Sequence, residues 1–151
     1  MKFLCDQMLG TLAKWLRIYG FDTYFASSII KDSDLLKISK DEDRVLLTRD
    51  KELIYQARRE NIKTFEIKST DMDKALSDIL SEVKIDKKKI LSRCILCNST
   101  VEEIKKELVK EKVPERVFNN NEKFWQCKKC NKIYWKGSHF EKMKEKINNL
   151  S

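Results

Sequence analysis

The feature that most constrains this chain is a pair of C-x-x-C motifs in its C-terminal half. Cys94 and Cys97 form the first motif, Cys127 and Cys130 form the second, and 29 residues separate the two. Each motif fits a tight turn that brings two thiolates together, and two such turns suit a tetrahedral zinc ion with four cysteine ligands. A small segment with little apolar core gains most of its folding free energy from such a metal. We therefore predict a structural Zn²⁺ site in this half of the chain.

Two other uses of paired cysteines fit the spacing. Two disulfides would need an oxidising compartment, of which the sequence shows no sign. A redox-active C-x-x-C is chemically possible as well, but two matched motifs favour one shared metal ion. The fifth cysteine, Cys5, lies within a short apolar run, and we expect it to act as a small hydrophobic residue.

Aromatic and basic residues are interspersed around the second motif, in the stretch FWQCKKCNKIYWKGSHF (124–140). Aromatic rings beside lysines can stack on bases and hold phosphates, but a ribbon this small also needs aromatic side chains to cover its metal. We favour the covering role for the aromatic residues. We expect His139 to make a structural hydrogen bond, because four cysteines already complete the site. The lysines that we expect to contact phosphates are Lys128, Lys129, Lys132 and Lys136.

The first half of the chain alternates between two kinds of pattern. Short apolar runs predict strands at 2–5, 23–26, 44–48 and 62–67. Amphipathic spacing predicts helices at 7–20, 32–40, 51–60 and 71–83, the second of them with Asp32 or Ser33 as its N-cap. This alternation predicts an α/β fold with a parallel sheet and helices on both faces.

These patterns divide the chain into three regions. Residues 1–83 form the predicted α/β domain, 84–92 a charged linker, and 93–151 a zinc ribbon with a C-terminal helix. Residues 1–83 hold 14 Lys and Arg against 15 Asp and Glu, whereas 84–151 hold 18 against 9. Such asymmetry suggests an anionic partner, nucleic acid first, although a solubilising lysine-rich surface explains it equally well.

The sequence gives no sign of a membrane partner. No apolar run reaches the length of about 18 residues that a membrane-spanning helix needs. The N-terminal stretch MKFLCDQMLG lacks the long apolar region of a signal peptide. We therefore expect a cytoplasmic protein.

Several aspartates follow predicted strands, at the edge where an open parallel sheet binds its ligands. They are Asp6 after the first strand, Asp32 and Asp34 after the second, and Asp50 after the third. Clustered carboxylates repel one another unless a cation neutralises them, and oxygen ligands without histidine suit Mg²⁺ or Mn²⁺. Such an ion activates water for attack on a phosphodiester. Taken singly, each aspartate is better explained by helix capping, whereas the acids together with a basic ribbon favour catalysis.

Five stretches resemble one known family. They are FLCDQMLGTLAKWLRIYGFDT, DSDLL, RVLLTRDKEL, RCILCN and KIYWKGSH. Together they resemble the mut-7 C-terminal RNase domain family, a PIN-like fold joined to a C-terminal zinc ribbon. The likeness covers about residues 2–144 and implies a Mg²⁺- or Mn²⁺-dependent PIN-type ribonuclease.

The resemblance also implies roles for individual residues. Asp6, Asp34 and Asp50 match the acidic positions of the family, with Asp32 as a rival to Asp34. Thr48 and Arg49 flank this site, and Lys14 and Arg17 on the first helix are further candidates for phosphate contact. The acids depart from the four-acid pattern of many PIN nucleases, since aspartates stand at the middle position and no clear fourth acid follows Asp50.

Three functions are compatible with these observations. The first is an RNA-cleaving enzyme whose basic ribbon holds RNA, either tRNA or another structured or single-stranded RNA. The second is a non-catalytic RNA-binding module, associated with tRNA or ribosomes, whose acids are only helix caps. The third is an adaptor whose ribbon binds a protein. A homodimer is compatible with the resemblance.

Overall fold

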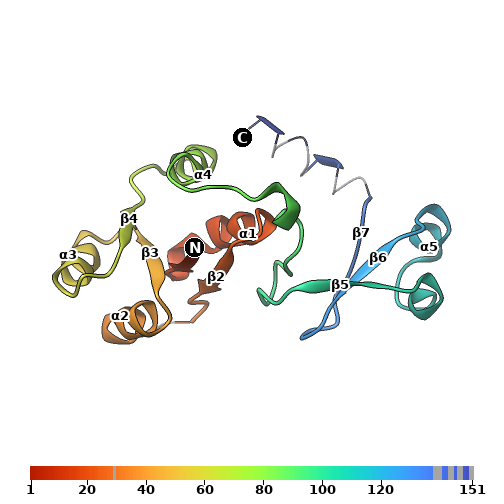
Figure 1. The fold of residues 1–151 in the computed structure, drawn as a ribbon, viewed down its shortest axis with the longest axis horizontal. Helices are drawn as coiled ribbons and strands as arrows, with labels where there is room; N and C mark the ends of the chain where they lie inside the picture. Colours follow the sequence, from red (N-terminus) through yellow and green to blue (C-terminus); the bar gives the residue numbers. More distant parts are fainter. Residues whose placement is uncertain (29, 138–140, 143–144, 146–147, 150–151) are drawn as a thin grey trace. The chain divides into compact units, whose positions relative to one another are not determined.

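The computed structural model describes all residues except 29, 138–140, 143–144, 146–147 and 150–151. The chain divides into two compact units, residues 1–91 and 92–151 (Figure 1). His139 and much of the expected C-terminal helix lie outside the described residues.

The first unit alternates strands and helices. Its elements are β1 (Lys2–Cys5), η1 (Gln7–Leu9), α1 (Gly10–Ile18), β2 (Asp22–Phe25), α2 (Asp32–Asp41), β3 (Arg44–Thr48), α3 (Lys51–Arg59), β4 (Thr64–Glu66) and α4 (Met72–Ser81). The four strands are parallel in the order β2-β1-β3-β4. The parallel α/β fold predicted from the sequence is therefore confirmed. The expected first helix begins as a 3-10 turn, η1, before the α-helix.

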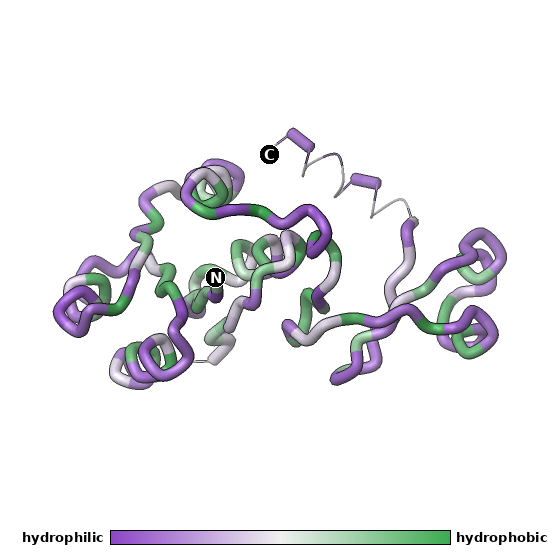
Figure 2. The backbone as a smooth tube through the Cα atoms, in the orientation of Figure 1, coloured by the Kyte–Doolittle hydropathy of each residue, from purple (hydrophilic) through white to green (hydrophobic). Residues whose placement is uncertain are grey.

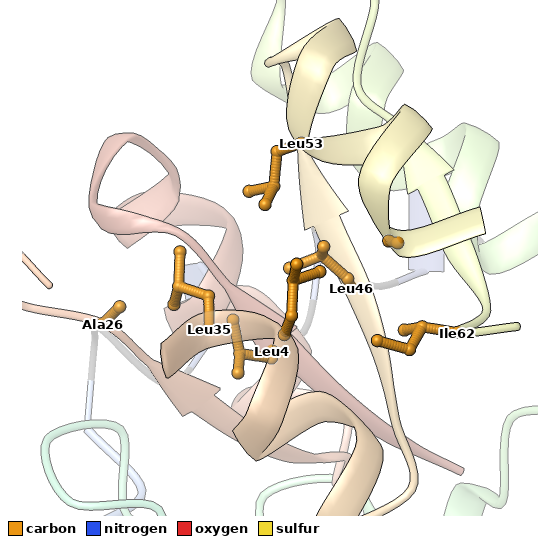
Figure 3. Close-up of a cluster of buried hydrophobic side chains, with 8 residues drawn as sticks. Leu4, Ala26, Leu35, Leu46, Leu53 and Ile62 are labelled. Atoms are coloured by element: carbon orange, nitrogen blue, oxygen red, sulfur yellow. The ribbon is translucent and has the colours of Figure 1, made fainter. Parts of the chain in front are cut away.

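The sheet is covered on both faces (Figure 1). On one face, α2 and α3 pack over a cluster that Figure 3 draws: Leu4, Ala26, Leu35, Leu36, Leu46, Leu53, Ala57 and Ile62. Strand side chains alternate between faces, so Phe3 and Leu47 belong to the opposite face, where α1 and α4 pack against each other. In Figure 2, α2 and α3 each carry hydrophobic and hydrophilic residues, as expected of helices with one buried side.

The segment that we expected to be a linker is largely part of the first unit. Asp86 caps a 3-10 turn, η2 (Lys87–Lys89), and the Leu91 amide donates to the Ile18 carbonyl at 2.7 Å. Gly20 explains how this segment comes so close. Its φ is +93°, and a Cβ at this position would lie 2.4 Å from the Lys89 carbonyl oxygen.

The second unit is an antiparallel ribbon with a helical insertion between two of its strands. Its strands are β5 (Val101–Ile104), β6 (Phe124–Cys127) and β7 (Ile133–Trp135), in the order β5-β6-β7. Between β5 and β6 lie η3 (Lys106–Val109) and α5 (Glu115–Asn120). The first C-x-x-C motif lies just before β5, and the second begins at the last residue of β6 and ends before β7.

Candidate active site and metal centre

Asp6 and Asp50 follow two neighbouring strands of the sheet. Asp6 directly follows β1 and Asp50 lies two residues after β3, and the two strands pair in parallel with Cys5 opposite Leu47. The Asp6 amide donates to the Leu47 carbonyl at 3.4 Å, which continues this pairing one step further. The two aspartates therefore lie at the same carboxyl edge of the sheet, as their positions in the sequence predict.

The side chain of Thr48 connects these two aspartates. Its hydroxyl donates to Asp6 Oδ2 at 2.5 Å and accepts from the Asp50 backbone N–H at 3.1 Å. Thr48 is fully buried as the last residue of β3. Because it is both buried and bonded on two sides, Thr48 fixes Asp6 relative to the start of α3.

Both aspartates also cap the helix that follows them. Asp6 Oδ1 accepts from the Met8 amide at 3.0 Å at the start of η1. Asp50 Oδ1 accepts from the amides of Glu52 and Leu53 at 2.9 and 3.3 Å at the start of α3. Capping thus uses one oxygen of Asp50, and each carboxylate oxygen has two lone pairs. Capping and metal binding are compatible in this arrangement.

Asp71 shows what capping alone looks like. It precedes α4, and its Oδ1 accepts from the amides of Asp73 and Lys74 at 3.0 and 3.5 Å. This is the same pattern as at Asp50. Asp71, however, follows the edge strand β4, whereas Asp50 follows β3, which pairs with β1.

The position between β1 and β3 is special in the topology. The chain leaves β1 into α1 on one face of the sheet and leaves β3 into α3 on the other (Figure 1). Ligands of open α/β sheets bind outside the carboxyl ends of the strands at such a switch of direction. Asp6, Thr48 and Asp50 surround this position.

Asp32 and Asp34 lie in the first turn of α2, and both are exposed. The N-cap of α2 is Lys31, with no side-chain hydrogen bond, so the expected cap at Asp32 or Ser33 was wrong. Acidic side chains in the first turn stabilise a helix through its dipole without capping it. These two acids therefore do not act as side-chain N-caps for α2.

The predicted acids do not form a closed ligand cluster. Among the described residues, the group of three or more Cys, His, Asp or Glu side chains whose ligand atoms lie close together is the cysteine quartet alone. Thr48 connects the Asp6 carboxylate to the Asp50 backbone, and Asp34 lies in a separate element, α2.

The cations expected near this edge differ in exposure. Lys14 and Arg49 are exposed. Arg17 is buried, with 7% of its surface accessible, and its Nε donates to the Thr23 carbonyl at 3.0 Å. Its guanidinium therefore helps hold α1 against β2, and the phosphate contact expected of Arg17 stays a prediction.

The four cysteines of the two C-x-x-C motifs converge, as predicted. Their sulfur atoms all lie within 4.8 Å of one another, with Cys94 Sγ 3.7 Å from Cys130 Sγ and Cys97 Sγ 3.1 Å from Cys127 Sγ. A tetrahedral Zn²⁺ with Zn–S bonds of about 2.3 Å places its sulfurs about 3.8 Å apart. All five cysteines are free thiols. The quartet therefore has the ligand type, number and spacing that zinc requires.

The two C-x-x-C motifs end in turns of the same conformation. Asn98 and Asn131 immediately follow the second cysteine of each motif, have φ of 68° and 65°, and donate their amides to the carbonyls of Cys94 and Cys127. Asparagine tolerates this left-handed conformation better than most residues. The repeated sequence C-x-x-C-N is the signal for this turn.

Two cysteines of the quartet have pKa values that are shifted in opposite directions. Burial opposes ionisation of Cys97, but hydrogen bonds from the Ser99 backbone and from the neighbouring cysteines lower its pKa to about 6. The Lys132 backbone amide favours the Cys130 thiolate, yet burial and the other three cysteines raise the pKa of Cys130 to about 11. Four thiolates need a cation beside them before all can ionise, which is what a bound zinc ion provides.

Tyr134 covers the quartet. Its hydroxyl lies 3.0 Å from Cys94 Sγ and accepts from the Ile95 amide at 3.2 Å. Burial and the contact with Cys94 raise the pKa of Tyr134. For this aromatic residue the covering role that we favoured is the one observed.

The lysines of the ribbon make different contacts. Lys128 forms an ion pair with Glu102 at 2.7 Å. Lys132 Nζ lies 5.6 Å from the Tyr134 ring centre, and Lys136 Nζ lies 5.5 Å from that of Trp125. Lys129, in the turn of the second motif, is exposed.

A model of the Mut7-C RNAse domain matches residues 1–147. A comparison with curated proteins gives no match. In the described part of the chain, no helix is long and apolar enough to cross a membrane. Because the family model covers nearly the whole chain, including both units, this protein belongs to the Mut7-C RNAse domain family.

Proposed function

We propose that this chain is a PIN-type ribonuclease that hydrolyses RNA phosphodiester bonds with Mg²⁺ or Mn²⁺. Asp6 and Asp50 would hold the cation, with Asp34 as the third ligand and Asp32 as its rival. The cation would supply activation of water and neutralise charge at the scissile phosphate. Carboxylate oxygens without histidine fit either ion.

The observation that supports this proposal most is the bridge through Thr48. A buried hydroxyl bonded to Asp6 and to the Asp50 backbone holds two carboxylate-bearing segments together at the β1/β3 switch point. Helix capping alone requires no such connection between two strands. Membership of an RNase domain family supports the same reaction.

RNA would be held by cations of both units. Arg49 is exposed directly before Asp50, and Lys14 is exposed in the middle of α1, the helix that follows Asp6 and η1. In the ribbon, Lys128, Lys129, Lys132 and Lys136 would contact phosphates. A structural Zn²⁺ in the cysteine quartet would keep this surface folded.

The experiment compares two aspartates that cap in the same way. Wild type, Asp50→Asn and Asp71→Asn are incubated with a mixture of tRNA and single-stranded RNA in Mn²⁺. Asparagine is as good an N-cap as aspartate, so both variants should keep their melting temperatures. We expect Asp50→Asn to lose cleavage by at least 100-fold, in line with typical losses at catalytic groups, and Asp71→Asn to cleave like wild type. Equal cleavage by all three proteins would place the active site elsewhere.

A non-catalytic RNA-binding module is the second candidate. The open arrangement of Asp6, Asp34 and Asp50 favours it, because these acids do not form a closed ligand cluster. RNA binding without cleavage in Mg²⁺ or Mn²⁺ by the wild-type protein would support this function. A protein-binding adaptor would instead show no RNA affinity that falls steeply with salt concentration.

A further inference from the structure

The second unit contains a groove that the proposed active site does not use. Its volume is about 690 Å³, within the range of small-molecule pockets. It lies on one face of the β6–β7 hairpin and beside the segment that leads into α5. The residues that line it are Lys112, Val113, Gln126, Asn131, Lys132, Ile133 and Trp135.

Trp135 forms the aromatic wall of this groove. It pairs with Phe124 across the hairpin, and their ring centres lie 6.5 Å apart. Phe124 is fully buried, so it fixes one side of the indole, while Trp135 remains half-exposed. A Cβ at Gly137 would lie 2.9 Å from Trp135 Nε1, so a residue without a side chain is needed beside this ring.

The charged residues of the groove are all cationic. Lys112 and Lys132 line it, and none of its lining residues is acidic. Gln126 Nε2 donates to the Asn131 carbonyl at 3.2 Å, which fixes the amide plane in the groove wall. The groove thus combines a fixed aromatic ring, an oriented amide and two cations.

We propose that this groove binds one unstacked nucleotide of a single-stranded RNA, an inference that rests on the proposed function. The base would stack on Trp135, Lys112 and Lys132 would contact the adjacent phosphates, and the Gln126 amide would face the edge of the base. Aromatic rings beside cations are the usual means of holding single strands. The groove would select unpaired RNA segments, because a base must leave its stack to enter.

The first test measures Trp135 directly. A Trp15→Phe/Trp125→Phe variant leaves Trp135 as the only tryptophan. Oligouridylate is added without a divalent cation, so that binding is read without cleavage, while labelled oligouridylate reports affinity in parallel. We expect Trp135 emission to be quenched at the same RNA concentrations that saturate binding.

The second test removes the cations without touching the packed ring. Lys112→Ala/Lys132→Ala is compared with Lys87→Ala/Lys88→Ala, which removes the same charge from exposed η2. Each lost phosphate contact should lower the salt slope of single-strand binding by about 0.7. We therefore expect the slope to fall by about 1.4 in the groove variant and to stay near its wild-type value in the η2 variant. Trp135→Leu should weaken binding roughly 5- to 150-fold.

The outcomes separate the groove from the proposed function. RNA binding without quenching, or equal effects of the two lysine pairs, would overturn the proposal that the groove binds a nucleotide. The proposed ribonuclease activity would not be affected by either result. Equal quenching and full competition by an acidic peptide would also overturn it, since the groove would then bind anions of any kind. No RNA binding by wild type would overturn both proposals.

Discussion

The two units of this chain are held together in different ways. In residues 1–91, fully buried apolar side chains lie on both faces of the sheet. In residues 92–151, the buried residues among those described are Cys94, Val109, Phe124 and Cys127. Two of these four are members of the cysteine quartet. Each buried leucine or phenylalanine contributes about 1.5–3 kcal/mol, so apolar burial stabilises the first unit, whereas the second depends on what its cysteines bind.

The two units also differ in the functional groups that they carry. The carboxylates at the β1/β3 switch point belong to the unit with the stable core, where a site can be held rigidly. The ribbon carries 14 Lys and Arg against 8 Asp and Glu in residues 92–151, and it offers a groove rather than an acid cluster. Under the proposed function, the first unit would react with RNA and the ribbon would help to hold it.

The largest effect should follow from loss of the metal. Cys127→Ser in the full chain removes a buried ligand, and structural zinc in small domains contributes about 10–16 kcal/mol of apparent binding free energy. We expect the variant to lose zinc and to become sensitive to proteases after residue 91, while residues 1–91 keep their helical circular dichroism. Zinc content and mass spectra of the protease-resistant fragment measure this.

Cys5→Ala is the control for that change. Cys5 is buried in β1, and burial together with the nearby Asp6 carboxylate raises the pKa of its thiol, which keeps it neutral. This variant should retain one zinc ion per chain. Zinc loss on replacing Cys5, or a protease-resistant ribbon in Cys127→Ser, would contradict the division into two kinds of stability.

The second effect concerns the apolar core. Leu46 lies in β3 with no accessible surface, within the cluster of Figure 3. Leu46→Ala should lower the free energy of unfolding of the first unit by about 2–5 kcal/mol and leave zinc content unchanged. Urea denaturation followed by circular dichroism measures it. Leu108→Ala, at a leucine that is 59% exposed, should change stability by less than about 0.5 kcal/mol.

The regular parts of this molecule were readable from the sequence because they repeat. Short apolar runs, separated by amphipathic stretches, predicted the positions of β1 and β3 to within a residue. The spacing of the two C-x-x-C motifs predicted the cysteine quartet. Asp6 and Asp50 could be placed at one edge because parallel strands end on the same side.

The remaining features depend on contacts between distant residues. Periodicity does not reveal that the Arg17 guanidinium bonds a carbonyl of β2 and is buried. The charged segment 84–92 was predicted to be a linker, because nothing local in the sequence indicates that Gly20 leaves room for Lys89. The bridging role of Thr48 likewise appears only once β1 and β3 are paired.

The third effect concerns that bridge. Thr48→Val keeps the shape of the side chain and removes the hydroxyl that bonds Asp6 and Asp50, which should cost about 1–3 kcal/mol in the first unit. If Thr48 positions the acids, cleavage should fall while RNA affinity stays constant, and Thr48→Ser should restore it. Thermal melting, RNA affinity and cleavage rate are measured side by side. Unchanged cleavage by Thr48→Val would show that the bridge is only structural.

The smallest expected effect concerns asparagines with positive φ, one in each unit. Asn61, after α3, and Asn131, in the second cysteine turn, have φ of 60° and 65°. Replacing either by alanine should cost about 1 kcal/mol, because a Cβ-bearing residue without a polar side chain resists this conformation. Asn61→Ala should lower only the urea midpoint of the first unit, whereas Asn131→Ala should lower only the chelator concentration that removes half of the zinc.

Glycine provides the matched control at both positions, since it adopts positive φ without steric cost. Asn61→Gly should therefore keep the wild-type urea midpoint, and Asn131→Gly should keep the wild-type zinc retention. If Asn131→Ala shifted the urea midpoint of the first unit as much as Asn61→Ala does, the two units would unfold as one. That result would mean that the metal stabilises the sheet as well as the ribbon, and the contrast between the two units would have to be abandoned.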